Sequence, residues 1–537
     1  MVRPASQKGH ARARALLALL AGAVLVTACG GGATKPSASP KVATKAGRSQ
    51  AVHPAHTVPK VTAPVGPSTF MGPDGVEARW VIAENEKPGT TAWHLSGDGA
   101  ATINGFANLT AAAAGQKVTL YITTTAPRYH ISAYRIGYYG GKGGRLVWRS
   151  PEMKGAVQPA CTVTASTRMV ACDNWAPSIS LTIGAEFVQG DYLFKLVADP
   201  GQQSYVPLTV WDPASHATYV IQNSVLTWEG WNTWGGYDMY TADMAYVDSF
   251  DRPYADGNGA GDFMALEYPL VYWAEQHGLD VTYWTDVTFS EYPGLLLNHK
   301  ALLTLGHDES WTMNERNGVI KARDSGVNIV FFGASPVLRH VRLQPSPLGQ
   351  DREEVDYRDP QLDPVYATDP LAATGNTWAV PPDNDPPSEI VGDTYLGYGL
   401  DDPMVVTDAT AWPWAGTGAT DGTKLPGVVT GDYDGYDTGS AGPAGVEILA
   451  HSPVHAEQSV AGTAPYSDMS YYTWPGGGGV LATGTIGWIP ALSSCKGGLP
   501  TCPAPVVQAA TGNILHLFGE GPASKTHPSV ANWQTYY

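Results

Sequence analysis

The stretch Ala301-Leu302-Leu303-Thr304-Leu305-Gly306-His307-Asp308-Glu309-Ser310-Trp311 decides the fold expected for this chain. Its first five residues are an uninterrupted apolar run, which is typical of a strand buried on both faces. A helical pattern begins at Asn314, so the polar residues 307–309 lie where a strand gives way to a helix. In open α/β sheets, ligands bind at that carboxyl edge. The stretch therefore predicts both a buried sheet and a site at its edge.

His307 and Glu309 alternate along the chain. In extended backbone, alternate side chains project to the same side. An imidazole and a carboxylate that converge there can hold a metal or transfer protons. The alternative is a helix N-terminus, with Ser310 or Thr312 as the capping residue and the acids favoured by the first turn.

The residues around this stretch alternate between strand and helix patterns. This alternation predicts a parallel α/β sheet in residues 215–537. An aromatic, glycine-rich loop at 227–240 is expected to line a pocket or to lie beneath another element. The expected strands are 219–222, 279–284, 301–305 and 327–333, and the expected helices are 267–278, 314–325 and 513–519.

Residues 67–214 have a different pattern, with period-2 alternation and frequent turn residues. Several short strands at such spacing predict an antiparallel, immunoglobulin-like β-sandwich. The run Gly140–Gly144 is expected to form a hairpin loop. The expected strands are 78–83, 118–122, 134–138, 145–148 and 192–197. The predicted fold class is thus a multidomain protein with a β domain followed by an α/β domain.

The first 28 residues combine basic residues with the apolar run Ala15–Ala28. That run is shorter than the roughly 20 residues that span a bilayer and fits a secretory signal. It ends in Leu25-Val26-Thr27-Ala28-Cys29, which resembles a bacterial lipobox. The resemblance implies a diacylglycerol on Cys29 and a lipid-anchored protein on the extracellular face of the bacterial cell membrane. Plain secretion is the alternative.

Residues 29–66 contain no aromatic residue and are rich in Gly, Ala, Ser, Pro and Thr. Such a composition cannot bury a core and predicts a disordered tether. Residues 1–66 hold nine Lys or Arg and no acid, whereas the whole chain has a net charge of −17. The remainder is therefore strongly acidic, which argues against binding to nucleic-acid phosphates.

Four cysteines follow the tether, in two pairs that are close in sequence: Cys161 with Cys172, and Cys495 with Cys502. In an oxidising compartment, two local disulfides are the simplest expectation. No CxxC motif or histidine cluster accompanies them, so a zinc site is not expected.

Several segments together resemble the large (β) subunit of N,N-dimethylformamidase, chiefly over residues 217–520. They are Trp228–Tyr240, Ser249–Tyr254, Gly306–Trp311, Phe331–Ser335, Arg339–Arg342, Leu425–Asp434 and Tyr471–Trp488. The resemblance implies a glutamine-amidotransferase-like α/β fold and an amidohydrolase. It also implies a mononuclear iron held by two tyrosinates and one glutamate, with a histidine close to the glutamate.

The implied iron ligands map only in part onto this chain. The His-x-Glu element matches His307 and Glu309, and one tyrosine matches Tyr240. The other tyrosine is expected within Thr227–Asn232, where this chain has Trp228 and Trp231, and tryptophan does not ligate iron. Tyr237 and Tyr254 are both possible substitutes. If iron is bound, it would polarise a carboxamide oxygen and activate water, while His307 orients Glu309 or shuttles a proton.

Two further features have a functional and a structural interpretation. Ser335 ends a buried strand where a nucleophile can sit, but it lacks the Gly-x-Ser-x-Gly elbow and is expected to be a turn residue. Asp432 and Asp434 have oxygen ligands for calcium, but the loop signature is incomplete and a turn is favoured. The expected substrate pocket comprises Trp228, Trp231, Asn232, Tyr254 and Trp311.

The sequence thus predicts a surface-anchored amidohydrolase-like enzyme that hydrolyses a small linear amide by a metal-assisted mechanism. A non-catalytic lipoprotein that binds carbohydrate or peptide is the alternative, and an enzyme of different chemistry on the same scaffold is a third. A small subunit or a second copy of the chain is a possible partner.

Overall fold

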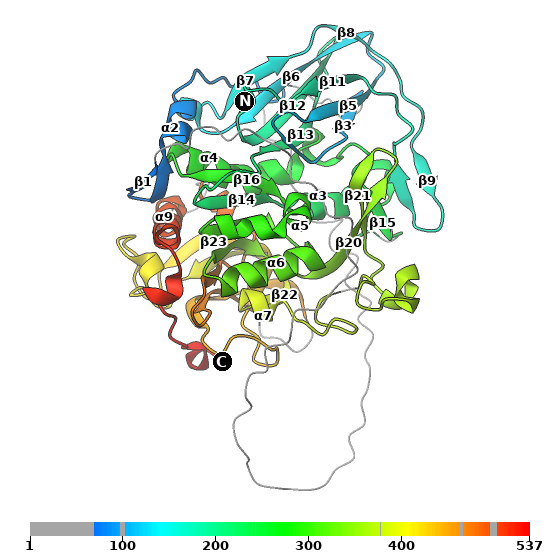
Figure 1. Cartoon of the computed structure of the whole chain (residues 1–537). Coiled ribbons are helices and arrows are strands. Elements are labelled where there is room, and N and C mark those ends of the chain that lie inside the picture. The colour runs from blue at the N-terminus through cyan, green and yellow to red at the C-terminus, as the bar shows by residue number, and fades with distance from the viewer. Residues whose placement is uncertain (1–68, 97–101, 242, 376, 461–464, 494–501) are drawn as a thin grey trace.

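The computed structural model describes residues 69–96, 102–241, 243–375, 377–460, 465–493 and 502–537. The predicted signal peptide (1–28), the tether (29–66) and Cys495 lie outside these residues. The described chain is β-rich and contains several separate sheets (Figure 1). Within this described part, no helix is both long and apolar enough to cross a membrane.

A seven-stranded mixed sheet forms the centre of the molecule, in the order β16-β14-β17-β19-β27-β26-β24. The first five strands of this order run parallel, as the alternating pattern predicts. The last two are antiparallel additions. Their bounds are β14 Tyr219–Asn223, β16 Val281–Thr285, β17 Ala301–His307, β19 Asn328–Ala334, β24 Glu447–Pro453, β26 Tyr466–Thr473 and β27 Gly479–Ala482.

The central strands are apolar throughout because both faces of the sheet are covered. Along β17, Leu303 belongs to the hydrophobic core on one face and Leu302 to the core on the other. Helices α4 and α9 pack on the first face and α6 on the second. The helices are α3 Val225–Gly230, α4 Tyr268–Gln276, α5 Asp286–Glu291, α6 Met313–Asp324, α7 Ser388–Val391, α8 Trp488–Ala491 and α9 Ala504–Glu520.

Two sheets precede the central sheet in the chain and enclose a core of their own; they are antiparallel except where β4 pairs with β13 in parallel. One has the order β11-β5-β3, and the other has the order β4-β13-β12-β6-β7 with β8 paired to β6. The strands are β3 Ile103–Ala107, β4 Ala111–Ala113, β5 Lys117–Thr124, β6 Arg128–Ile136, β7 Gly144–Arg149, β8 Met153–Lys154, β11 Ile179–Thr182, β12 Gly190–Ala198 and β13 Gln203–Trp211. The glycine run at 140–144 lies in the β6–β7 connection, as expected.

The prediction of a strand at 78–83 is wrong. A short hairpin of β1 (Thr69–Gly72) and β2 (Gly75–Ala78) ends there, and helix α2 (Arg79–Asn85) follows. Its buried residues are Val81 and Glu84, three positions apart on one helix face. Six residues are too few for a period-2 pattern to exclude this helical spacing, and packing against α4 decides the outcome.

Two smaller sheets lie beside the central one. The first has the order β15-β21-β20-β18 and the second β23-β22-β25. Their strands are β15 Val247–Ser249, β18 Ser310–Thr312, β20 Arg339–Ser346, β21 Gly349–Val355, β22 Thr394–Val405, β23 Lys424–Gly435 and β25 Ala456–Ser459. Strand β20 brings Arg339 and strand β23 brings Asp432 to the carboxyl edge of β17.

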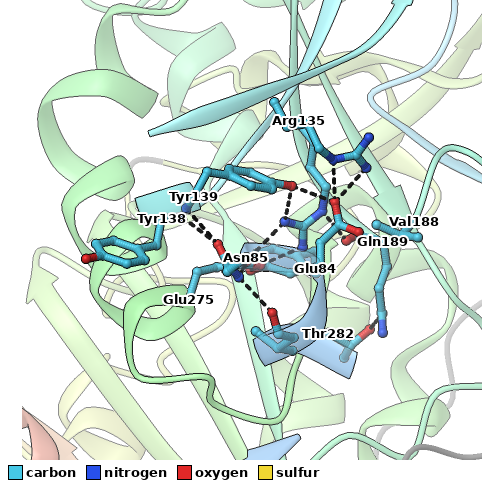
Figure 2. Close-up of polar contacts among 12 residues, drawn as sticks. Glu84, Asn85, Arg135, Tyr138, Tyr139, Val188, Gln189, Glu275 and Thr282 are labelled. Atoms are coloured by element: carbon cyan, nitrogen blue, oxygen red, sulfur yellow. Dashed lines mark hydrogen bonds and ion pairs between the residues drawn. The ribbon is translucent and has the colours of Figure 1, made fainter. Parts of the chain in front are cut away.

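A buried polar cluster joins the N-terminal sheets to the central sheet (Figure 2). Arg135 of β6 pairs with Glu275 of α4 at 2.6 Å, and both side chains are fully buried. Glu275 also accepts a hydrogen bond from Tyr283 of β16, at 2.5 Å. On the other side, Tyr139 donates to Glu84 of α2 at 2.8 Å. The cluster therefore ties β6 and the turn after it to α2 on one side and to α4 and β16 on the other.

A second junction is a hairpin of β9 (Thr162–Thr164) and β10 (Met169–Ala171), which extends from the N-terminal sheets towards β15 (Figure 1). The disulfide Cys161–Cys172 closes its base, as predicted. Cys502 is also disulfide-bonded, and its predicted partner Cys495 lies outside the described residues. The hairpin contacts the segment that follows the aromatic loop. Tyr246 N–H donates to the carbonyl of Thr167 at 2.8 Å, and Arg168 donates to the carbonyl of Met244 at 2.9 Å.

Candidate functional site

The His-x-Glu element lies at the carboxyl edge of the central sheet, as predicted. His307 is the last residue of β17, and Glu309 lies in the short connection before β18. Gly306 makes this sharp change of direction possible, because its φ is +59° and a Cβ there would approach Leu266 to 2.7 Å. Thr312, one of the two capping residues that the alternative named, caps α6 and forms a capping box with Glu315.

Glu309 is buried and is surrounded by donors. Its Oε1 accepts a hydrogen bond from Nε of Arg339 at 2.9 Å, and its Oε2 accepts one from Tyr240 Oη at 2.7 Å. The Trp231 indole N–H lies 3.4 Å from the same Oε2. Burial alone would raise the pKa of Glu309, but Arg339 and His307 outweigh it and hold that pKa well below its usual range. The carboxylate is therefore ionised.

Tyr240 is held in place by a ring on one face and a guanidinium near its π-system. Trp231 stacks on it with ring centroids 3.6 Å apart and an interplanar angle of 8°. The Arg358 guanidinium carbon lies 4.4 Å from the centroid of its ring. Burial and the charge of Glu309 raise the pKa of Tyr240 well above its ordinary value. The phenol is therefore neutral and serves Glu309 as a hydrogen-bond donor.

His307 lies between two carboxylates from distant parts of the sequence. Its Nε2 is 3.3 Å from Oε2 of Glu309 and 3.2 Å from Oδ2 of Asp432, which belongs to β23. Burial alone would lower the pKa of His307, but the two carboxylates outweigh it and raise that pKa to about 10. An imidazolium flanked by two carboxylates therefore stands at the sheet edge at neutral pH.

The residues at this site do not fit the iron that the resemblance implies. Trp231 stands in the stretch where the second tyrosine is expected, but it stacks on Tyr240 and its N–H points to Glu309 as a donor. Arg339, Tyr240 and Trp231 already satisfy both oxygens of Glu309. The possible substitute Tyr254 lies instead against Trp228, with ring centroids 6.2 Å apart.

Four of the five predicted pocket residues line one narrow pocket beside the site, namely Trp228, Trp231, Asn232 and Tyr254. Asn232 also braces the pocket wall, since its amide donates to the Pro253 carbonyl at 3.0 Å and accepts from Ala255 N–H at 3.1 Å. Trp311 lies elsewhere: it is fully buried in the core on the α6 face, and its indole donates to the Asp308 carbonyl.

Sequence reasoning missed three side chains that shape this site. Arg339 arrives because β18 and β20 pair in parallel and place Ser310 opposite Arg339. Asp432 was considered only as a calcium ligand or a turn residue, but it lies within β23. Tyr395 of β22 is the third. Burial and the negative charges of Asp432 and Glu309 raise its pKa above the ordinary range. An alternating Asp432-x-Asp434 pair within a strand was the available signal.

Comparisons with known proteins agree with the family suggested by the sequence. No curated protein matches this chain. Among solved structures, murine CEACAM1b matches at 11% identity over 23% of this chain and 62% of its own length; its TM-score of 0.12 carries no argument. The family model described as N,N-dimethylformamidase beta subunit-like, C-terminal, matches residues 130–502, more than two thirds of the sequence. This chain therefore belongs to the N,N-dimethylformamidase beta subunit-like family.

Proposed function

We propose that this protein hydrolyses a small linear carboxamide to a carboxylic acid and an amine at the His307–Glu309 edge of the central sheet. The observation that carries the proposal is the convergence of His307, Glu309 and Tyr240 at one edge, with contacts of 3.3 Å or less. Membership of an amidohydrolase-like family supports the reaction class.

In this proposal, His307 protonates the leaving amine. The two carboxylates raise the pKa of His307 and keep it protonated at neutral pH, so the imidazolium has a proton to give to the departing nitrogen. Glu309 keeps that imidazolium charged and oriented, and Arg339 keeps Glu309 ionised. The pocket beside Trp231 receives the acyl or alkyl group of the amide.

The test compares His307→Gln and Glu309→Gln with wild type in the release of amine from formamide and short N-alkyl amides. Loss of a general acid lowers kcat/KM by about 10²–10⁴-fold. Matched controls are His455→Gln, whose imidazole is 83% exposed beside Asp402, and Glu457→Gln, which is exposed. Both controls are expected to keep wild-type rates.

Metal analysis accompanies the assays because the donor set does not fit iron. Purified wild type is expected to contain far less than one iron per chain, and added iron or chelator is expected to leave the rate unchanged. One iron per chain that disappears in Glu309→Gln would overturn this part of the proposal. Rates that are equal in wild type and both site variants would overturn the hydrolase assignment itself.

The fold class proposed from the sequence has partial support. We infer that residues 67–214 form an immunoglobulin-like sandwich and residues 215–537 a glutamine-amidotransferase-like α/β domain. Support for the sandwich is the pair of largely antiparallel sheets around one core. Support for the α/β domain is the run of parallel strands with helices on both faces.

We also propose that the protein is lipid-anchored on the extracellular face of the bacterial membrane through a diacylglycerol on Cys29. The support is the lipobox-like sequence. Metabolic labelling with radioactive palmitate should mark wild type and not Cys29→Ser, and the variant should appear in the medium. Equal labelling of the two chains would contradict the anchor.

A binding protein for carbohydrate or peptide is the second candidate. The stacked, half-buried pair Trp231 and Tyr240 favours it, because such a platform binds the faces of sugar rings. Binding of an oligosaccharide that is lost in Trp231→Ala, with no amide hydrolysis by wild type, would select this candidate. A small subunit or a second copy is a proposed partner, which size determination of the purified protein would test.

A further inference from the structure

Ser335 occupies a strained turn at the same edge of the sheet. It follows β19 directly, is buried, and has a φ of +59°. A non-glycine residue in this left-handed region is strained, and such strain is concentrated at functional sites. The backbone N–H of Ser335 is fixed by Asp434, whose two carboxylate oxygens accept it at 2.9 and 3.0 Å. The surrounding structure therefore enforces this conformation.

The Ser335 hydroxyl has a base within reach. Its Oγ donates a hydrogen bond to Oδ2 of Asp432 at 2.8 Å. The same Oδ2 lies 3.2 Å from Nε2 of His307. Strands β19, β23 and β17 thus bring a hydroxyl, a carboxylate and an imidazolium into contact in that order. A nucleophile bonded to a base, with a third group next to that base, is the arrangement of nucleophilic catalysis.

We propose that Ser335 is the nucleophile of this site and Asp432 its general base. The inference rests on the proposed function for the identity of the substrate, an amide. Ser335 Oγ forms a bond to the amide carbonyl carbon and gives its proton to Asp432. The carbon–nitrogen bond then breaks, the nitrogen takes a proton from His307, and the amine leaves an ester on Ser335.

The second half of the reaction restores the groups. Asp432 passes its proton to His307 across the 3.2 Å contact. Water attacks the ester carbonyl and gives a proton to Asp432, the ester bond breaks, and Ser335 Oγ takes that proton back. The sum is amide plus water to acid plus amine, and no further reactant is needed.

A structural role makes a different prediction for the same contacts. In that case the hydroxyl only fastens Asp432 beside His307, and no covalent bond to Ser335 ever forms. The burial of Ser335, which is 1% exposed beside the 19% exposed side chain of Asp432, fits such a structural role as well. The experiment must therefore detect the bond to Ser335 itself.

The test treats the full chain with a small fluorophosphonate and maps the adduct by mass spectrometry. In wild type, Ser335 Oγ is expected to displace fluoride from the reagent, so that the peptide containing Ser335 carries one phosphonyl group. Asp432→Asn is expected to react at least about 10-fold more slowly, because the base is removed. Ser335→Ala and Ser335→Gly are expected to remain unlabelled and to lose about 10²-fold or more in hydrolysis. Ser524→Ala is the control and is expected to be labelled like wild type.

The glycine variant protects the test against misfolding. Glycine adopts a positive φ without strain, so Ser335→Gly should unfold at the wild-type temperature or above it. Labelling at Ser335 in a wild type that hydrolyses no amide would support the nucleophile and refute the proposed substrate. Hydrolysis that continues in Ser335→Gly, or an absence of any adduct on wild-type Ser335, would overturn the inference and leave the hydrolase proposal standing on its own evidence.

Discussion

Asp191 shows how a single buried acid affects the stability of this chain. It is 4% exposed, and its Oδ1 accepts a hydrogen bond from Thr209 at 3.1 Å. Its Oδ2 has no hydrogen-bond partner among the residues that the structure describes. Burial raises the pKa of Asp191 to about 7. The carboxyl is therefore costly to ionise inside the folded protein.

This cost predicts a pH-dependent effect of Asp191→Asn. The unfolded chain ionises Asp191 near 3.8, and the folded chain near 7. The contribution of Asp191 to stability is therefore complete below about pH 4 and is lost as the pH rises through 7. Asparagine carries no charge to bury. The free energy of unfolding of the variant, taken relative to wild type, should therefore rise by at least about 1.4 kcal/mol between pH 4 and pH 8.

Urea denaturation at the two pH values measures that gain. The exposed Asp243→Asn is the control, and its difference from wild type should be the same at both values. A gain for Asp191→Asn that does not change with pH would show that the carboxyl is already ionised when the protein is folded.

At the level of secondary structure, the β9–β10 hairpin connects the N-terminal sheets to the segment that follows the aromatic loop. Its disulfide closes a short loop, and Cys172 N–H donates to the Asp251 carbonyl at 2.7 Å. The two contacts at Thr167 and Arg168 hold the loop on the C-terminal side of Tyr240. The N-terminal sheets therefore contribute to the site without lining it.

Replacing both cysteines by serine tests this role. Cys161→Ser/Cys172→Ser should lower the free energy of unfolding by about 2–4 kcal/mol, the usual worth of such a cross-link. Limited proteolysis should then cut within residues 231–246 at protease concentrations that leave wild type intact. A variant that is destabilised but cut elsewhere would show that the hairpin does not hold the loop.

For the molecule as a whole, the cluster at Arg135 and Glu275 determines how the N-terminal sheets dock on the central sheet (Figure 2). Removing one partner of a buried ion pair leaves the other charge without compensation, which costs about 3–5 kcal/mol. Arg135→Met should therefore destabilise the protein by that amount in urea denaturation. The double variant Arg135→Met/Glu275→Leu should cost less than the single one.

The surface pair Arg128 and Asp199, which is 66% and 54% exposed, supplies the matched control. Arg128→Met should change stability by less than about 1 kcal/mol, because solvent screens such pairs. Equal losses at the buried and the exposed pair would mean that the junction is not held by its charges.

Features that depend on neighbouring residues could be predicted from the sequence, whereas contacts between residues far apart in the chain could not. The parallel strands were predictable because 301–305 and 327–333 are apolar without interruption, as burial on both faces requires. The meeting of His307 with Glu309 followed from local alternation. Asp432 could not be predicted, because its contact with His307 joins residues more than a hundred positions apart through separate sheets. Helix α2 was missed because tertiary packing overrode a short local pattern.

The hairpin that carries Cys161 and Cys172 also affects how the protein should be produced. A chain expressed in a reducing cytosol would lack the cross-link, and the segment beside Tyr240 would lose one of its supports. Preparations from cytosolic and periplasmic expression would then differ in specific activity at identical purity. The thiol content of each preparation should accordingly be titrated before its turnover is compared with that of another.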